Sequence, residues 1–224
     1  AEQLADRETK LLAYRGSIQA ILDGYLDFNV DDFAGRVHTN FTRLKRELKK
    51  HVRIDGQRPV EVDIRNSQPL FLALCLKANG VEDREYSELC EQGRLYDHIA
   101  SLGGWTRHRA KEGLIATTFF GKNHQTNEVK RLFDRTFPAV AEYIRRTKAK
   151  DYKRLSQQLQ RAEAKYIIHG VCDRIRKERP ATRLTTIHDS ILTTPEAAEY
   201  VMVVMAEEFA TLGVGPRLEA EPCE

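Results

Sequence analysis

Two short segments with the alternation of β-strands constrain this chain more than any other feature. In residues 60–64 an apolar side chain stands at every second position, between Glu61 and Asp63, and residues 184–194 are β-branched with a similar alternation. The long stretch between them is rich in helical patterns. We therefore expect an α+β fold, in which a small antiparallel sheet joins the two distant segments and helices flank it.

Helical spacing of apolar residues marks the rest of the chain. We expect helices within residues 7–26, 81–150, 155–179 and 195–213, with a break at Phe137–Pro138. Residues 216–221 have the character of a last strand. No internal repeat or low-complexity linker divides the chain into separate units.

Charge and cysteine content narrow the class of protein. With 41% hydrophobic and 31% charged residues, the chain is a soluble protein that can build a core. The net charge of +3 does not by itself indicate nucleic-acid binding, and the basic run at 43–53 fits either a solvated helix face or a contact with a nucleic-acid backbone. Four cysteines without a CxxC pair favour a reducing cytoplasm over a zinc or disulfide framework, and no apolar run approaches a membrane span.

Each strand segment carries an aspartate near its end. Asp63 closes the first segment and Asp189, preceded by His188, stands in the middle of the second. Carboxylates on adjacent strands can hold two divalent cations, which suits phosphoryl transfer. Taken singly, each Asp is equally well a surface residue at a strand end, and His188 a histidine at the edge of the core.

The segment RHRAKEGLIATTFFG, residues 107–121, carries a second chemical signal. On a helix, residues 107, 111, 115 and 118 share one face, so Arg107 and Lys111 are followed by apolar side chains. A nucleoside triphosphate has the same polarity, with phosphates at one end and a flat base at the other. The simpler interpretation is an amphipathic helix with a solvated basic edge.

Three ordered motifs then resemble family A DNA polymerases, of the DNA polymerase I type, and the related single-subunit phage RNA polymerases. They are Asp63-Ile-Arg-Asn-Ser-Gln68, Arg107-x3-Lys111-x7-Phe119-Phe120-Gly121, and Ile187-His188-Asp189-Ser190. Softer matches in GRVHTNF and LQRAEAKYI extend the resemblance over nearly all of residues 10–220.

The resemblance implies a polymerase right-hand palm with a helical fingers insert and a truncated thumb. The expected divisions are residues 1–35 for a thumb remnant and connecting helix, 36–80 for the first part of the palm, 81–154 for the fingers and 155–224 for the second part of the palm.

The resemblance also implies a role for each matching residue. Asp63, Asp189 and the backbone carbonyl of Ile64 would ligate two Mg²⁺ ions, for which Mn²⁺ could substitute. Arg107 and Lys111 would bind the triphosphate, with Lys111 also protonating the leaving pyrophosphate. The remaining expectations are stacking on the nucleotide by Phe119 or Phe120, a sugar contact by Gln68, and primer–template binding by His188, Gln160, Arg36 and Lys45.

The sequence departs from the family at several of these positions. One extra residue precedes Gly121, Phe replaces the usual Tyr, and Gln68 stands where the DNA enzymes have a Glu that blocks a ribose hydroxyl. Ser190 follows the last Asp, as in the RNA polymerase branch.

The implied function is template-directed transfer of dNMP from a dNTP to a primer 3′ end, by two-metal catalysis without proofreading. An N-terminal region or a partner protein would complete the thumb. The alternatives are a ribonucleotide-using or primer-independent nucleotidyltransferase, and an inactive polymerase-like module that only binds nucleic acid.

Overall fold

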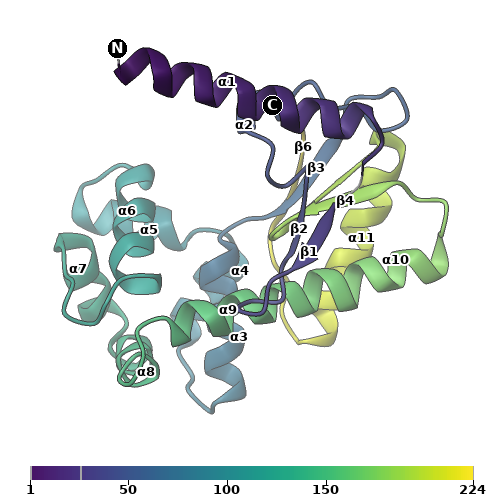
Figure 1. Ribbon diagram of the computed structural model, residues 1–224. Coiled ribbons are helices and arrows are strands. Elements are labelled where there is room, and N and C mark those ends of the chain that lie inside the picture. Colours follow the sequence, from purple (N-terminus) through teal and green to yellow (C-terminus); the bar gives the residue numbers. More distant parts are fainter. Residues whose placement is uncertain (1, 26, 224) are drawn as a thin grey trace.

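A four-stranded antiparallel sheet forms the centre of the computed structural model, which describes residues 2–25 and 27–223 (Figure 1). Its strands run in the order β4 (Leu184–Ile187), β5 (Ser190–Thr193), β3 (Val60–Ile64) and β6 (Leu218–Pro222). The two segments that open the sequence argument thus lie side by side, with Val62 opposite Ile191. The α+β fold is confirmed, as are the pairing of the distant segments and the last strand.

The alternation in β3 separates an apolar face from a polar one. Val62 and Ile64 are fully buried in the core, whereas Asp63 points to the other face of the sheet and is only partly covered. Helices α3 (Ser67–Ala78) and α11 (Pro195–Thr211) contribute Phe71 and Phe209 to the same core. The direction of Asp63 therefore follows directly from the strand period.

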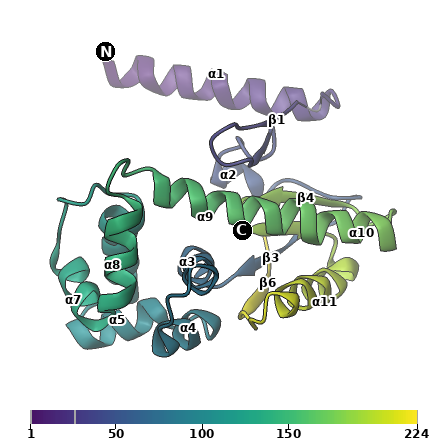
Figure 2. The ribbon, with the colours of Figure 1, turned by 90° about the horizontal axis from the view of Figure 1, so that it is seen from below.

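A long helical rod runs past the sheet and past α3. It consists of α9 (Arg154–Ala164), a π-helical segment η2 (Lys165–Cys172) and α10 (Asp173–Glu178). In Figure 2 the rod lies between α1 on one side and α3 and α11 on the other. The predicted helix over residues 155–179 is confirmed, because its apolar side chains recur at helical spacing along one face.

Residues 84–147 form a helical lobe beside the sheet (Figure 1). The lobe contains α4 (Arg84–Glu91), α5 (Leu95–Gly103), α6 (Arg107–Leu114), the π-helical segment η1 (Ile115–Phe119), α7 (Glu128–Thr136) and α8 (Pro138–Thr147). Asp83, Thr106 and Asn127 cap α4, α6 and α7 with their side chains. Pro138 begins α8, which explains the predicted break between α7 and α8.

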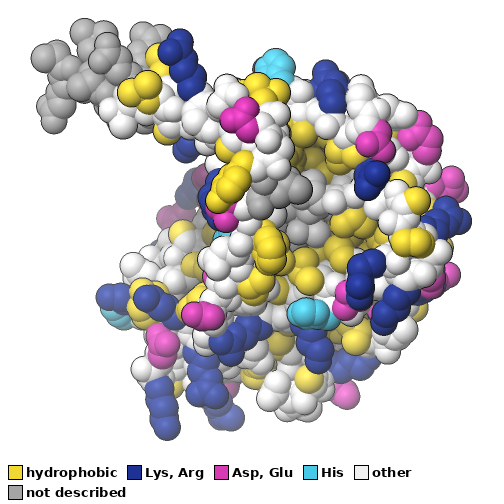
Figure 3. Space-filling model, turned by 45° about the vertical axis from the view of Figure 1, so that its right-hand side comes forward, with side chains coloured by type: hydrophobic (Ala, Val, Ile, Leu, Met, Phe, Trp, Pro, Cys, Tyr) yellow, Lys and Arg dark blue, Asp and Glu magenta, His cyan; other side chains and the backbone are white. Residues whose placement is uncertain are grey.

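The first helix stands apart from this core, whereas the segment that follows it packs on the sheet, with Phe41 against Leu192. Helix α1 (Glu2–Leu22) projects over a broad notch in the body (Figure 3), and Leu12 and Leu22 are 67% and 73% exposed. A small hairpin of β1 (Phe28–Val30) and β2 (Val37–Thr39) follows. The basic run at 43–53 forms only one short helix, α2 (Arg46–Lys49).

The search for a membrane span gave a negative result: no described helix combines the length and the apolar character that a bilayer crossing requires.

Candidate active site

A cleft of about 400 Å³ lies where β3, the β4–β5 turn, α3, α6 and α9 meet. It brings together most of the residues that the sequence singles out. Those that line it are Asp63, Ile64, Gln68, Arg107, Lys111, Phe120, Arg36, His188 and Asp189. Acidic and cationic side chains that are distant in sequence therefore share one concave surface, as expected from the two aspartates and the basic helix.

The acidic side of the cleft consists of Asp63 and Asp189. Burial, the largest cause, and the negative charges of Asp189 and Glu61 together raise the pKa of Asp63 to about 7, while the Ile64 backbone amide and Lys111 oppose the rise. Two carboxylates that interact so strongly without a matching cation are a hard-oxygen donor set of the kind that Mg²⁺ and Mn²⁺ prefer. Ile64 has a buried side chain and also borders the cleft, so its backbone is the part available there.

The donor set is small. Among the residues that the structure describes, no three His, Cys, Asp or Glu side chains converge at metal-ligand spacing. The residues thus fit a cation that two carboxylates and a carbonyl hold while a phosphate-bearing ligand supplies further oxygens, which is the usual arrangement for Mg²⁺ in phosphoryl transfer.

A strained turn presents Asp189. His188 and Asp189 connect β4 to β5, and His188 has φ of +55°, a conformation that side-chain-bearing residues rarely adopt. The Ser190 hydroxyl lies 3.0 Å from the Ile187 carbonyl and 2.6 Å from Glu61 Oε1, so it ties the turn to the neighbouring strand β3. Ser190, a departure from the DNA branch, therefore has a structural role here and is itself buried.

The cationic side of the cleft is helix α6. Arg107 and Lys111 lie one turn apart, and both face the acidic side. The guanidinium of Arg107 lies 5.7 Å from the centre of the Tyr96 ring, 3.4 Å from Asp97 and 3.4 Å from the Asn66 side-chain oxygen. These contacts orient the fork of Arg107, whereas Lys111 is exposed and free to meet a ligand.

The two phenylalanines after α6 take different positions. Phe119 is 0% exposed and packs in the hydrophobic core, whereas Phe120 lines the cleft. The amide of Phe120 donates to the Ile115 carbonyl at 3.0 Å, a five-residue step that makes η1 a π-helix. The π-turn thus accommodates the two successive phenylalanines before Gly121, and of the two candidates for stacking only Phe120 borders the cleft.

The same π-turn alters the face predicted for residues 107, 111, 115 and 118. Ile115 reaches the cleft, but Thr118 is buried. Gly121 closes the turn, and a Cβ there would lie 2.4 Å from the Ala116 carbonyl oxygen, so only glycine fits. The buried ammonium of Lys148 then holds the turn by donating to the carbonyls of Thr118 and Gly121, at 2.5 and 2.9 Å.

Two residues expected at the site lie outside the cleft. Gln160 is half-buried on α9, and Lys45 is exposed just before α2. Their assignment to primer–template binding stays a prediction.

Several polar groups in the cleft have no hydrogen-bond partner. Among the described residues these include the buried atoms Asn66 Nδ2, Ser67 Oγ, Gln68 Oε1 and Arg107 Nε. Unpaired buried polar atoms are rare in folded proteins, and here they gather at the N-terminus of α3, where backbone amides also point outward. The cleft is therefore prepared for a polar ligand.

Sequence reasoning missed Glu163, which also lines the cleft. It is 0% exposed on α9, and burial together with the charge of Asp189 raises its pKa to about 7. A signal was present: Glu163 continues the buried stripe of Leu155 and Leu159 at four-residue spacing. An acid on an apolar stripe is a candidate functional residue.

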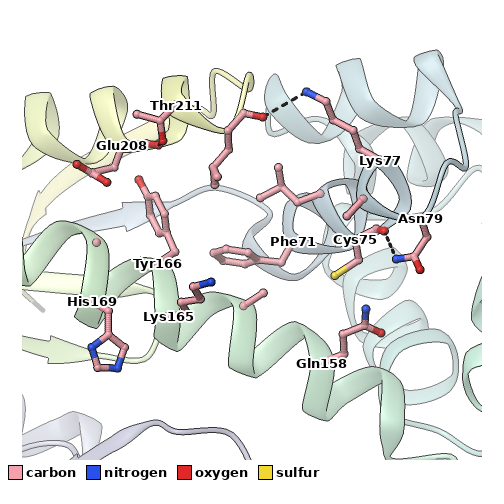
Figure 4. A pocket seen from close by; sticks show the side chains of 15 residues that line it. Phe71, Cys75, Lys77, Asn79, Gln158, Lys165, Tyr166, His169, Glu208 and Thr211 are labelled. Carbon is pink, nitrogen blue, oxygen red and sulfur yellow. Dashed lines mark hydrogen bonds between the residues drawn. The ribbon is translucent and has the colours of Figure 1, made fainter.

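A larger pocket of about 670 Å³ lies between α3, η2 and α11, but its chemistry differs (Figure 4). Phe71, Cys75 and Tyr166 give it an apolar floor, and Lys77 at its rim donates to the Leu212 carbonyl at 3.2 Å. It contains neither Asp63 nor Asp189. The acidic cleft is therefore the better candidate for catalysis.

The fold and the cleft together define a polymerase-like palm, a small antiparallel sheet covered by helices. A solved structure with this architecture is the POL domain of Pol1 from M. smegmatis, in complex with DNA primer–template and dNTP. The TM-score is 0.64 at 14% sequence identity, and the match covers 98% of this chain and 52% of that one. The chain thus spans about half of the length of its structural neighbour.

Comparisons of sequence give no further assignment. No family model matches the chain, and no curated protein matches it. The likeness is one of fold.

Proposed function

We propose that the chain is a template-directed nucleotidyltransferase of the family A type that adds dNMP to a primer 3′ end. The observation that supports this most is one cleft, on a polymerase-like fold, with Asp63 and Asp189 on one side and Arg107 and Lys111 on the other. In this proposal residues 36–80 and 155–224 are the palm, residues 81–154 the fingers and residues 1–35 a thumb remnant.

The carboxylates of Asp63 and Asp189 and the carbonyl of Ile64 would hold Mg²⁺ or Mn²⁺. Such ions, when bound, lower the pKa of the primer 3′-hydroxyl and neutralise charge on the transferred phosphate. The guanidinium of Arg107 binds the triphosphate oxygens. The positive charge of Lys111 acts on Asp63, so Lys111 is near enough to bind the same ligand.

The reaction forms one bond and breaks another. The primer 3′-hydroxyl loses its proton to water, and its oxygen attacks the α-phosphorus. The bond between the α-phosphorus and the bridging oxygen breaks, and pyrophosphate leaves with a proton from Lys111, which regains one from solvent. Phe120 stacks on the nucleotide, and Gln68 contacts its sugar. His188, Arg36, Gln160 and Lys45 contact the primer–template.

Primer extension tests the proposal. A labelled primer–template is incubated with the parent protein, Mg²⁺ and either dNTPs or rNTPs. Extension by dNTPs supports the proposal, extension by rNTPs supports a ribonucleotide-using enzyme, and binding of the duplex without product supports an inactive module.

The Asp189→Asn variant distinguishes catalysis from binding. It should lose extension while its affinity for the duplex stays equal or rises, because a negative charge near the phosphates is removed. Extension by this variant at the parent rate would show that Asp189 holds no catalytic cation.

A further inference from the structure

Glu163 is a buried carboxylate to which the proposed chemistry gives no role. It joins two residues of the cleft that come from other elements. Glu163 Oε1 accepts from Arg36 Nε at 2.8 Å and lies 2.5 Å from Arg36 Nη2, and Glu163 Oε2 accepts from Gln68 Nε2 at 2.7 Å. We call Glu163, Arg36 and Gln68 the Glu163 clamp.

The position of Glu163 is unfavourable for a carboxylate. It is fully buried within the continuous rod of α9, η2 and α10, and it is close enough to Asp189 to feel its charge. Arg36 compensates only part of this, since burial still dominates. If this position only supported the fold, an apolar side chain that continues the buried stripe of Leu155 and Leu159 would serve there at least as well as Glu163.

The contact with Gln68 determines how the Gln68 amide is oriented. In its ionised form, which Arg36 favours, Glu163 accepts but does not donate, so the Gln68 NH₂ faces Glu163 and the carbonyl Oε1 faces away from it. That Oε1 is one of the buried atoms without a partner. The clamp therefore holds the long, otherwise mobile Gln68 side chain in one rotamer at the N-terminus of α3.

We propose that Glu163 is a positioning residue that determines sugar selection through Gln68. This inference depends on the proposed function, in which Gln68 contacts the sugar of the incoming nucleotide. A rigid Gln68 leaves no room for an additional hydroxyl, whereas a released Gln68 can turn aside and admit a ribose.

The test is a double-mutant cycle read as sugar selectivity, the ratio of kcat/KM for dATP to kcat/KM for ATP. Gln68→Ala should lower this ratio, and Glu163→Leu should lower it by a similar roughly fivefold to tenfold, the value of about one net hydrogen bond. The double variant should match Gln68→Ala alone, because both changes act through the same side chain.

Two further variants separate positioning from a general structural effect. Glu163→Gln has one acceptor oxygen, which faces Arg36, so its NH₂ donates to a reversed Gln68 amide; the Gln68 side chain stays held and most of the selectivity should remain, even where kcat falls. Glu178→Gln, a carboxylate-to-amide change on α10 away from the cleft, should leave the ratio unchanged. Thermal unfolding of every variant identifies any that do not fold, and if Glu163→Leu is one of them, Glu163→Met takes its place in the cycle with Gln68→Ala.

A result in which Glu163→Leu slows both nucleotides equally, or in which the two changes add, overturns the inference. The ratio of dissociation constants for dATP and ATP, by calorimetry with primer–template present, is measured in parallel. If the parent protein binds both nucleotides but adds neither to the primer, the proposed function is refuted, and the ratio of the two dissociation constants still decides the role of Glu163. A parent that binds neither overturns both.

Discussion

Replacing Asp63 by Asn should stabilise the chain in a pH-dependent manner while it removes catalysis. The pKa of Asp63 rises from 3.8 for a free aspartate to about 7 in the fold. At about 1.4 kcal/mol per pKa unit, this difference sets an upper limit of about 4 kcal/mol on the cost of the ionised group. Partial contact with solvent reduces that cost, so we expect a gain of about 1–3 kcal/mol from Asn at pH 8.

The sign of this effect follows from linkage. Because the folded pKa of Asp63 is raised, the native state binds more protons than the unfolded state between pH 3.8 and about 7. The parent therefore loses stability as pH rises through this window, and Asp63→Asn does not. For a chain of this size the difference in Tm should grow to roughly 2–10 °C by pH 8 and nearly vanish at pH 4.

The assay is thermal unfolding from pH 4 to pH 8, with and without Mg²⁺, and Asp32→Asn serves as an exposed control. Mg²⁺ should raise the Tm of the parent at pH 8 more than that of Asp63→Asn, because a bound cation relieves the same repulsion. A difference in Tm that does not depend on pH, or a variant that is less stable at pH 8, would refute the argument that Asp63 is held at a cost.

Three further changes test separate parts of the cleft. Lys111→Ala should lower kcat/KM for dNTP by about 10²-fold or more, because the transition state loses a stabilising charge. Arg109 pairs with Glu128 on the outer side of α6, so Arg109→Ala should have little effect in the same assay. Phe120→Ala should raise the nucleotide KM roughly tenfold through lost stacking. Phe119→Ala should instead lower the free energy of unfolding, measured in urea, by about 3–5 kcal/mol. If Phe119→Ala raises KM and Phe120→Ala lowers stability, the positions assigned to the two rings by the π-turn are wrong. Lys148→Met should destabilise the chain by about 1–3 kcal/mol in urea, because two buried carbonyls lose their donor, and no loss would show that these carbonyls find other partners.

The parts of this fold that sequence could predict are those that depend on a regular period. Alternation placed β3 and the β4–β5 hairpin, and with them the direction of Asp63. The ordered motifs placed Arg107 and Lys111 on one helix opposite the acids. These features depend on residue type and spacing alone, and neither requires knowledge of which side chains meet in space.

The features that sequence missed arise from local breaks in that period. A helical wheel assumes 3.6 residues per turn, so it could not anticipate that the π-turn at η1 shifts the residues after Ile115 and places Phe120, of the two phenylalanines, at the cleft. Glu163 required a different kind of knowledge, since its role depends on Arg36 and Gln68, which are far away in sequence. Spacing marks Glu163 as an acid on an apolar stripe, but it does not show which side chains Glu163 meets.

Three buried or half-buried charges around the cleft oppose folding in the same way. Burial moves the pKa of Asp63 and of Glu163 up to about 7 and that of Lys148 down to about 8, in each case toward the neutral form. An uncharged side chain at any of the three would avoid the cost of burying a charge, although at Lys148 the loss of two hydrogen bonds outweighs that gain. All three lie on elements that hold the cleft: Asp63 on β3, Glu163 on α9 beside Gln68, and Lys148 against η1, which carries Phe120 into place. Proteins are only marginally stable, so costly buried charges are kept where a ligand supplies the opposite charge or a hydrogen bond. The grouping of these three charges around one cleft therefore favours an enzyme over an inactive binding module.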